Sequence, residues 1–399
     1  MFAFHSSLGQ QGWTNISANL PPSVTQVNDA FFIGDTGWIT GMTTGLVNFV
    51  GYTTDGGNSF TLQNFPANSG LIQQIFMRST HEGYCVTSRT SIGVNVYHST
   101  DPQNGGGTLM PGSPGVSLYG ISFPPLPDTI GYCSSGAGDV YRIGTHVTFD
   151  AHITSDALTS ICFPVSSDEG WVLGGTTIRH RIASGWVIDQ NYSSGRDYTS
   201  LYFKDNTHGW ASGEDGSVIY TTDGKNWVIE FIDPGQRSFN DVCFSDIRQG
   251  WVVGQGGLIF HTTDGGLNWD PAAGDITNSN MMLISVFATP DQTVYVTGTI
   301  ADTIGVLLKY TSTSGTGEPE MQNFSIYPNP CSDVLYLQFN QPEKNFQISV
   351  LNLYGEEVKR IENTNAQRQI SMGNLVSGAY FLRMENDKQI IMKKFCVVR

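Results

Sequence analysis

The sequence predicts an all-β protein with two folded domains, and three observations lead to this prediction. Glycine is abundant (46 of 399 residues), aromatic residues make up 12% of the chain, and charged residues only 14%. This composition suits many short strands joined by tight turns. A unit of 40–47 residues recurs between residues 24 and 310, and a different alternating pattern follows after residue 323. We therefore expect a repeat domain followed by a small Ig-like β-sandwich.

The repeated unit opens with an apolar strand that bears a phenylalanine. Six to nine residues later, a tryptophan or tyrosine opens a second strand. Each unit has room for about four short strands, so seven units predict a seven-bladed β-propeller over residues 11–310. The first markers are Phe32, Phe76, Phe123, Phe163, Phe203, Phe244 and Phe287, and the second are Trp38, Tyr84, Tyr132, Trp171, Trp210, Trp251 and Tyr295.

The ends of the propeller lead to two further expectations. The seventh unit has no fourth strand of its own, and residues 12–16 resemble the fourth strand of other units, so we expect them to complete the last blade. Residues 1–10 are either the remainder of a signal peptide or a frayed N-terminus. Residues 311–323 have the Ser/Thr/Gly/Pro composition of a flexible linker, which leaves residues 324–399 for the sandwich.

Charge and residue spacing argue against several classes of function. The net charge is −15, and residues 321–399 carry nine Lys/Arg against seven Asp/Glu, so the negative excess lies in residues 1–320. Such a body should repel nucleic acid and anionic lipid. No apolar run is long enough to span a membrane. The histidines lack metal-site spacing, and no cofactor motif is present, so we expect neither metal nor cofactor.

The cysteines form no CxxC pair. Cys162 and Cys243 fall at the same place in the repeat, inside apolar strands, where they are expected to be small buried hydrophobes. Cys331 and Cys396 lie near the two ends of the last domain. They would pair if its terminal strands are neighbours, which the sequence leaves open.

A turn motif of Thr, Asp, Gly and an aromatic residue occurs three times. It resembles the Asp-box, or bacterial neuraminidase repeat. In this motif the aspartate accepts backbone N–H bonds, the glycine supplies positive φ, and the aromatic residue packs under the hairpin. We interpret the three copies as structural. They comprise Thr53, Asp55, Gly57 and Phe60; Thr221, Asp223 and Trp227; and Thr262, Asp264, Gly266 and Trp269.

The whole repeat is most similar to the propeller family of photosystem II assembly factors, strongly over residues 203–227 and 244–269. The resemblance implies the fold and a docking role, without implying photosynthesis. A sialidase would need three convergent arginines and a tyrosine nucleophile, but residues 11–310 hold few arginines and no Arg-Ile-Pro segment ahead of the first turn motif. We therefore expect no catalytic residues.

One pair of loops offers a candidate binding site. Arg196 and Arg237 each lie seven residues before a strand phenylalanine, and Tyr198 and Phe239 follow two residues later. These equivalent loops should open on the face opposite the turn motifs. Two cations flanked by aromatic rings could bind a carboxylate, an acidic glycan or a partner protein. The alternative is that they are solvated loop residues packed against their own blades.

The C-terminal segment carries a series of motif residues at characteristic spacing, namely Tyr327, Pro328, Asn329, Pro330, Gly355, Gly378, Tyr380, Lys393 and Lys394. In order and spacing they resemble the sorting domain of type IX secretion substrates, which are found in Bacteroidetes. The resemblance implies that the export machinery reads residues 324–399. It also implies that the body is secreted or attached to the outer-membrane surface once the sorting domain is removed.

These inferences favour an exported, non-enzymatic propeller that binds or scaffolds a partner. Its expected partners are the secretion machinery, through residues 324–399, and an unidentified surface protein or glycan, through the propeller loops. The alternative is a glycan-binding or glycan-hydrolysing, sialidase-like propeller.

Overall fold

The computed structural model divides the chain into two units, residues 1–313 and 314–399. It describes residues 12–66, 69–88, 95–104, 107–193, 196–273, 276–311, 324–327, 331–339, 347–351, 357–361, 369–376, 378–385 and 390–397. Residues 1–10 and the predicted linker after residue 311 lie outside this description, as do Pro328–Pro330 and Gly355 of the sorting motif. Among the described residues, no helix is long and apolar enough to cross a membrane.

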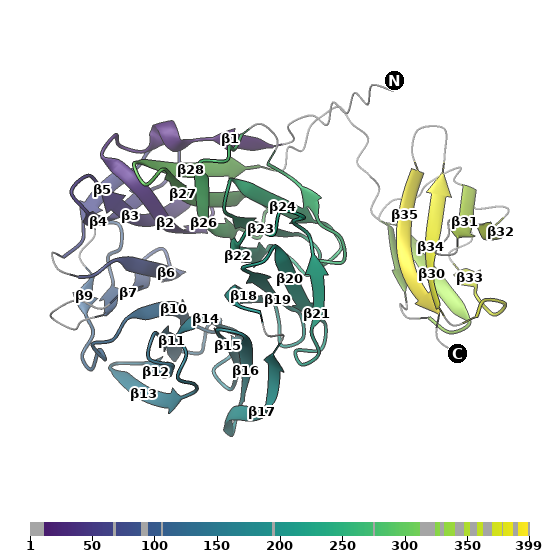
Figure 1. Cartoon of the computed structure of the whole chain (residues 1–399), viewed down its shortest axis with the longest axis horizontal. Helices are drawn as coiled ribbons and strands as arrows, with labels where there is room; N and C mark the ends of the chain where they lie inside the picture. The colour runs from purple at the N-terminus through teal and green to yellow at the C-terminus, as the bar shows by residue number, and fades with distance from the viewer. Residues whose placement is uncertain are drawn as a thin grey trace. The chain divides into compact units, whose positions relative to one another are not determined.

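The first unit is a ring of four-stranded antiparallel sheets, which confirms the predicted all-β propeller (Figure 1). The described residues form seven such sheets, here called blades 1 to 7. Their strands are β2–β5 (Val24–Ile33, Thr36–Thr43, Val47–Thr53, Thr61–Asn64); β6–β9 (Ile72–Ser79, Glu82–Thr87, Val96–Ser99, Thr108–Leu109); β10–β13 (Leu118–Ser122, Gly131–Ser135, Asp139–Ile143, Val147–His152); β14–β17 (Leu158–Ser166, Glu169–Gly174, Thr177–Ile182, Gly185–Ser193); β18–β21 (Tyr198–Phe203, Gly209–Gly213, Ser217–Thr221, Val228–Phe231); β22–β25 (Phe239–Phe244, Gly250–Gly254, Leu258–Thr262, Asp270–Pro271); and β26–β28 (Met281–Ala288, Val294–Ile300, Ile304–Tyr310) with β1 (Trp13–Asn15).

Blade 7 takes its outer strand from the start of the chain. β1 runs antiparallel to β28, with Trp13 opposite Tyr310 and Asn15 opposite Leu308. The short 3-10 helix η1 (Ser17–Asn19) follows, and the backbone N–H of Ile16 donates to Leu307 O at 3.0 Å. The two ends of the ring therefore share one sheet, which leaves β28 without an open edge.

The repeated aromatic residues meet at the interfaces between blades. Trp171 on β15 stacks on Phe203 of the next blade at 3.8 Å between ring centroids, and Tyr132 stacks on Phe163 at 4.0 Å. In five blades the glycine before the second marker lies under the phenylalanine of its own blade. At Gly209, for example, a Cβ would lie 2.4 Å from the Phe203 ring. The spacing Phe…Gly-Trp thus places the phenylalanine ring between the glycine of its own blade and the aromatic ring of the preceding blade.

Two of the predicted phenylalanine markers are wrong by one residue. In three blades the strand register pairs the marker with the glycine, as it pairs Phe244 with Gly250. Phe76 pairs instead with Tyr84, and Phe287 pairs with Tyr295. Because neighbouring residues of a strand point to opposite faces, these two rings face away from the marker position.

In these two blades the marker position is held by Met77, opposite Gly83, and by Ala288, opposite Val294. Phe76 and Phe287 instead pack around Phe31, with ring centroids 5.4 and 4.7 Å from it.

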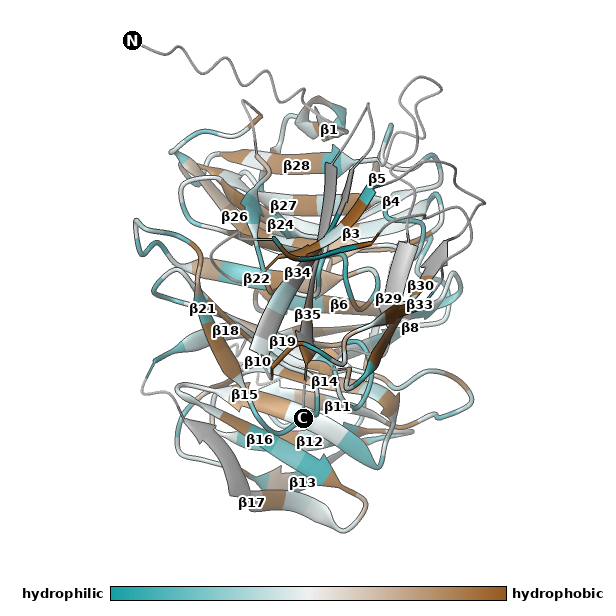
Figure 2. Cartoon of the chain, turned by 90° about the vertical axis from the view of Figure 1, so that its right-hand side faces the viewer, coloured by the Kyte–Doolittle hydropathy of each residue, from teal (hydrophilic) through white to brown (hydrophobic). Residues whose placement is uncertain are grey.

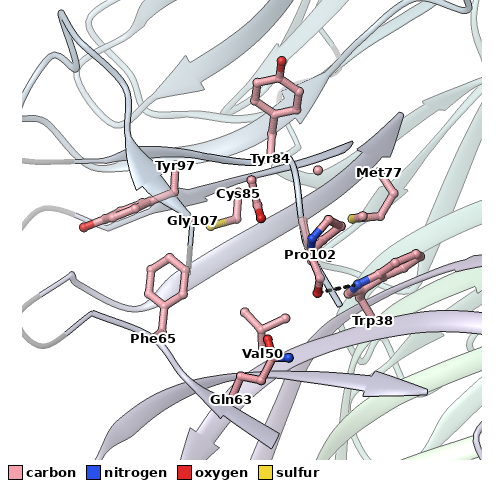
Figure 3. Close-up of a pocket in the computed structure, with 13 residues that line it drawn as sticks. Trp38, Val50, Gln63, Phe65, Met77, Tyr84, Cys85, Tyr97, Pro102 and Gly107 are labelled. Carbon is pink, nitrogen blue, oxygen red and sulfur yellow. Dashed lines mark hydrogen bonds between the residues drawn. The ribbon is translucent and has the colours of Figure 1, made fainter. Parts of the chain in front are cut away.

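The missing ring at Met77 leaves space between blades 1 and 2. Trp38 faces Met77 there, and a small apolar cavity of about 40 Å³ lies beside them (Figure 3). Cys85 also lines this cavity, and burial raises the pKa of its thiol well above the usual range. Cys133 and Cys243 are likewise buried, and Cys162 is nearly so, as expected for apolar strand positions.

The second unit is a small β-sandwich with one core. The core joins residues of both sheets, including Leu335, Val350, Leu382 and Phe395. One sheet has the order β29-β30-β33 and the other β32-β31-β34-β35. The strands are β29 (Phe324–Tyr327), β30 (Val334–Phe339), β31 (Gln347–Leu351), β32 (Glu357–Ile361), β33 (Gln369–Ser371), β34 (Gly378–Glu385) and β35 (Ile390–Val397).

Candidate functional site

The predicted loop site is only partly available for binding. Arg196 contacts the carboxylate of Asp215, and its guanidinium lies 4.7 Å from the Phe231 ring centroid. Arg237 makes a two-pronged contact with Asp233, from Nε to Oδ2 and from Nη2 to Oδ1, both at 3.0 Å. Each cation is therefore paired with an acid of blade 5 or the segment that follows it. A ligand would have to compete with that acid.

The aromatic half of the prediction is wrong. Tyr198 and Phe239 are 2% and 0% exposed, so neither ring can contact a ligand. Each is the first residue of an innermost strand and pairs with a glycine of the next strand, Gly213 or Gly254. The small partner leaves room for the ring, which packs into the blade core.

The three Asp-box turns hold neighbouring blades together. Asp264 accepts bonds from Asn268 N at 2.9 Å and Asn268 Nδ2 at 2.7 Å, and Thr262 Oγ1 donates to it at 2.9 Å. The turn so fixed presents Gly265 O to the indole N–H of Trp210 in the preceding blade, at 2.7 Å. Trp269, which closes the motif, lies edge-on to Phe244.

The other two turns make the same inter-blade contact. Trp171 Nε1 donates to Gly224 O at 3.2 Å, and Tyr295 Oη donates to Gly56 O at 3.2 Å. Hydrogen bonds from Ser59 and Thr53 lower the pKa of Asp55 to about 2. Bonds from Asn226 lower the pKa of Asp223 well below its usual range.

Two buried carboxylates link the innermost strands near the ring closure, a feature that the sequence analysis missed. Ser285 Oγ in blade 7 lies 2.8 Å from Asp29 Oδ1 in blade 1 and 3.0 Å from Asp241 Oδ2 in blade 6. Asp29 also accepts from Ile75 N in blade 2, and Asp241 accepts from Ser200 Oγ in blade 5. Burial raises the pKa of Asp29 to about 7 and also raises that of Asp241. These acids serve the contacts between blades.

A polar groove lies between the outer strands of blades 3 and 4. Its cavity measures about 310 Å³, and Asp150, His152, Arg179, Arg181 and Trp186 are among the residues that line it. Arg179 and Arg181 alternate with His180 on β16, so the two guanidinium groups share one face of the strand. β12, β13, β16 and β17 lie together on the rim of the ring (Figure 1), and part of this region is coloured as hydrophilic in Figure 2.

The groove holds cationic donors that no described residue satisfies. Nε and Nη1 of Arg179 and Nε of Arg181 are covered, yet they have no hydrogen-bond partner among the described residues. Burial lowers the pKa of Arg179. Arg181 is held in place by Ser167 O, at 2.6 Å from Nη1, and by the Tyr132 ring beneath it. Buried donors without partners are costly, so this groove is the strongest candidate in the described structure for binding an anionic group.

The opposite wall of the groove is formed by blade 3, with Asp150 and His152 on β13, whereas Trp186 lies beside Arg181 as its cross-strand partner in blade 4. Trp186 Nε1 donates to Asp150 Oδ2 at 2.9 Å, which joins blade 4 to blade 3. His152 Nδ1 lies 2.7 Å from Asp139 Oδ1 and is thereby fixed. The only sequence signal for this site was the Arg-His-Arg run of residues 179–181 in a strongly acidic body. No group of three or more potential metal ligands occurs among the described residues.

The two units resemble two known families. Residues 325–398 match the secretion system C-terminal sorting domain, and residues 193–277 and 232–304 match the photosynthesis system II assembly factor YCF48. Both resemblances are confirmed. The sorting domain places Tyr327 on β29, Gly378 and the buried Tyr380 on β34, and Lys393 and Lys394 on β35. Cys331 forms a backbone bridge with Val397. The side chain of Cys396 lies outside the described residues, so the pairing that the sequence leaves open is not tested.

Solved structures support the propeller fold. YCF48 from Cyanidioschyzon merolae has a TM-score of 0.57 and 16% identity, over 76% of this chain and 100% of that one. YCF48 bound to D1 peptide has a TM-score of 0.60 and 18% identity, over 76% and 98%. An inactive virginiamycin B lyase from Staphylococcus aureus with quinupristin has a TM-score of 0.61 and 13% identity, over 75% and 98%. No curated protein matches the sequence of this chain.

Proposed function

We propose that this protein is an exported, non-enzymatic propeller that binds a partner at the cell surface or in the medium. The sorting domain after the propeller is the observation that carries the proposal, because it addresses the chain to the type IX secretion machinery. A propeller of similar fold is known bound to a peptide, which supports a binding role. The buried acids on the innermost strands β2 and β22, Asp29 and Asp241, are occupied by contacts between blades, which favours binding over hydrolysis.

The export part of the proposal is tested by removing residues 324–399 in a type IX-competent host. Fractionation with a tag inside the propeller should then find the protein in the periplasm, while the full chain reaches the surface or the medium. Replacing Lys393 and Lys394 by alanine tests whether the basic end is part of the address. Surface display of the truncated chain would refute the role of the domain.

The binding part is tested by screening the purified full chain against glycans and outer-membrane proteins of the producing organism. We expect at least one ligand to bind saturably. We also expect the protein not to hydrolyse that ligand in a glycan-hydrolysis assay. Release of a sugar product would favour the alternative, a sialidase-like propeller. Replacing Arg196 and Arg237 by alanine tests the loop site, and unchanged affinity for every detected ligand would remove that site from consideration.

A further inference from the structure

The groove between blades 3 and 4 combines three kinds of chemistry in one cavity. Arg179 and Arg181 line the cavity, and three of their guanidinium nitrogens are covered and have no partner among the described residues. Asp150 offers carboxylate oxygens, of which Oδ2 already accepts from Trp186. The Trp186 indole, itself only partly covered, supplies an apolar face. The cavity of about 310 Å³ is at the small end of the range for ligand pockets.

Each chemistry selects a different part of a ligand. A guanidinium fork matches the planar carboxylate, and burial strengthens that contact. Asp150 accepts hydrogen bonds and repels a second negative charge close to it, so it requires a ligand with hydroxyl or N–H donors. An indole packs against an apolar C–H face. A hexuronic acid carries a carboxylate, hydroxyl donors and a C–H face on one ring.

An acidic peptide satisfies these groups less completely. An aspartate or glutamate side chain offers the carboxylate, but the donors for Asp150 would have to come from the peptide backbone, and such a side chain has no ring face to pack on Trp186. A simple inorganic anion would satisfy the arginines and leave the rest of the cavity empty. The combination of groups thus favours a single acidic sugar unit.

We propose that the groove formed by Arg179, Arg181, Asp150 and Trp186 binds a hexuronic acid unit, with its carboxylate on the two arginines. This assignment rests on the proposed binding function and names the ligand class for it. It places the site on the rim, away from the predicted loop arginines. A terminal or internal uronate of a surface polysaccharide would present such a unit.

The test is calorimetric titration of the full chain with D-glucuronate and D-galacturonate, with D-glucose, acetate, sulfate and tri-glutamate as comparison ligands. At least one uronate should bind saturably and more tightly than every comparison ligand. Its affinity should fall as salt increases. Replacing Arg179 and Arg181 by alanine should weaken it by about 10-fold or more. Arg179→Lys keeps the charge but loses the planar fork, so this variant should weaken uronate binding less than the double alanine variant does.

Lys225→Ala with Arg248→Ala is the charge-matched control, because it removes two cations from exposed positions outside the groove. It should leave uronate affinity unchanged, and the melting temperatures of all variants show whether they fold. Four results would overturn the assignment. They are binding of neither uronate, equal binding of acetate or sulfate, preference for tri-glutamate, and uronate binding that survives loss of both arginines.

The outcomes separate this inference from the proposed function. If the screen against glycans and outer-membrane proteins yields a ligand whose affinity is unaffected by the groove variants, the binding function is supported and the uronate site is refuted. If uronate binds through the groove but the screen finds no surface partner, the uronate site is supported and the surface-binding role is refuted.

Discussion

Trp210 of blade 5 lies flat against Phe244 of blade 6, with 3.6 Å between the ring centroids and 14° between the ring planes. The same indole donates its N–H to Gly265 O, in the Asp-box turn of blade 6. Both side chains are almost fully buried. One tryptophan therefore contacts both the innermost strand and the Asp-box turn of the next blade.

Replacing Trp210 by alanine should lower the free energy of unfolding by about 3–5 kcal/mol, because the ring contacts and the indole hydrogen bond are lost together. Urea unfolding followed by tryptophan fluorescence and circular dichroism measures the change. Phe231→Ala, at an exposed position of the same blade, is the control and should cost far less. Equal losses in the two variants would contradict the role of this interface.

Replacing Met77 by phenylalanine should stabilise the protein. The ring would lie over Gly83 and face Trp38, as Phe244 does over Gly250, and it would fill the cavity of about 40 Å³ (Figure 3). At about 24 cal/mol per Å³, filling it contributes on the order of 1 kcal/mol. Calorimetry should show a small rise in melting temperature, with Leu109→Phe, on an exposed outer strand, as the control. A lower melting temperature would show that the interface cannot take the ring.

The buried pair Asp29 and Asp241 should make stability fall as pH rises from about 4 to 8. The folded pKa of Asp29 is raised to about 7 by burial, so the folded state binds more protons than the unfolded state in this range. The stabilisation is complete below the unfolded pKa and is lost as pH passes through the folded pKa. The melting temperature measured across this range should show the decline.

Asp29→Asn should flatten that pH profile and also lower stability at every pH, since the amide cannot accept from Ile75 N, Ala30 N and Ser285 Oγ in the same way. Asp302→Asn, at an exposed turn, should keep the wild-type profile. A profile for Asp29→Asn as steep as that of the wild type would refute the assignment of the pH dependence to this site.

Removing residues 1–17 should lower the melting temperature by roughly 10 °C, because β28 loses its partner strand and blade 7 is left with an open edge. Removing only residues 1–11 is the matched control, since it keeps Trp13 opposite Tyr310 and the contact of Ile16 with Leu307. If both truncations melt at the wild-type temperature, β1 does not contribute to closure.

The sequence by itself determined the repeat and the sorting domain. Phenylalanine, glycine and tryptophan at fixed spacing, with the Thr-x-Asp turn, suffice to specify a blade, because each makes its contacts within its own unit or the next one. The spacing could not show that Phe76 and Phe287 are offset by one residue, because strand register decides which residue faces the glycine position, and an apolar run that contains a phenylalanine does not reveal its register.

The tertiary structure alone decided where binding groups are accessible. The loop spacing of Arg237, Tyr198 and Phe239 suggested a binding site. In the structure Arg237 is paired with Asp233, four residues before it. Tyr198 and Phe239 lie opposite glycines and point into the core. Arg179 and Arg181 became a candidate only when β13 of another blade brought Asp150 against Trp186. Local spacing governs how a blade is built, but burial and the availability of a charged group depend on which other blades lie against it.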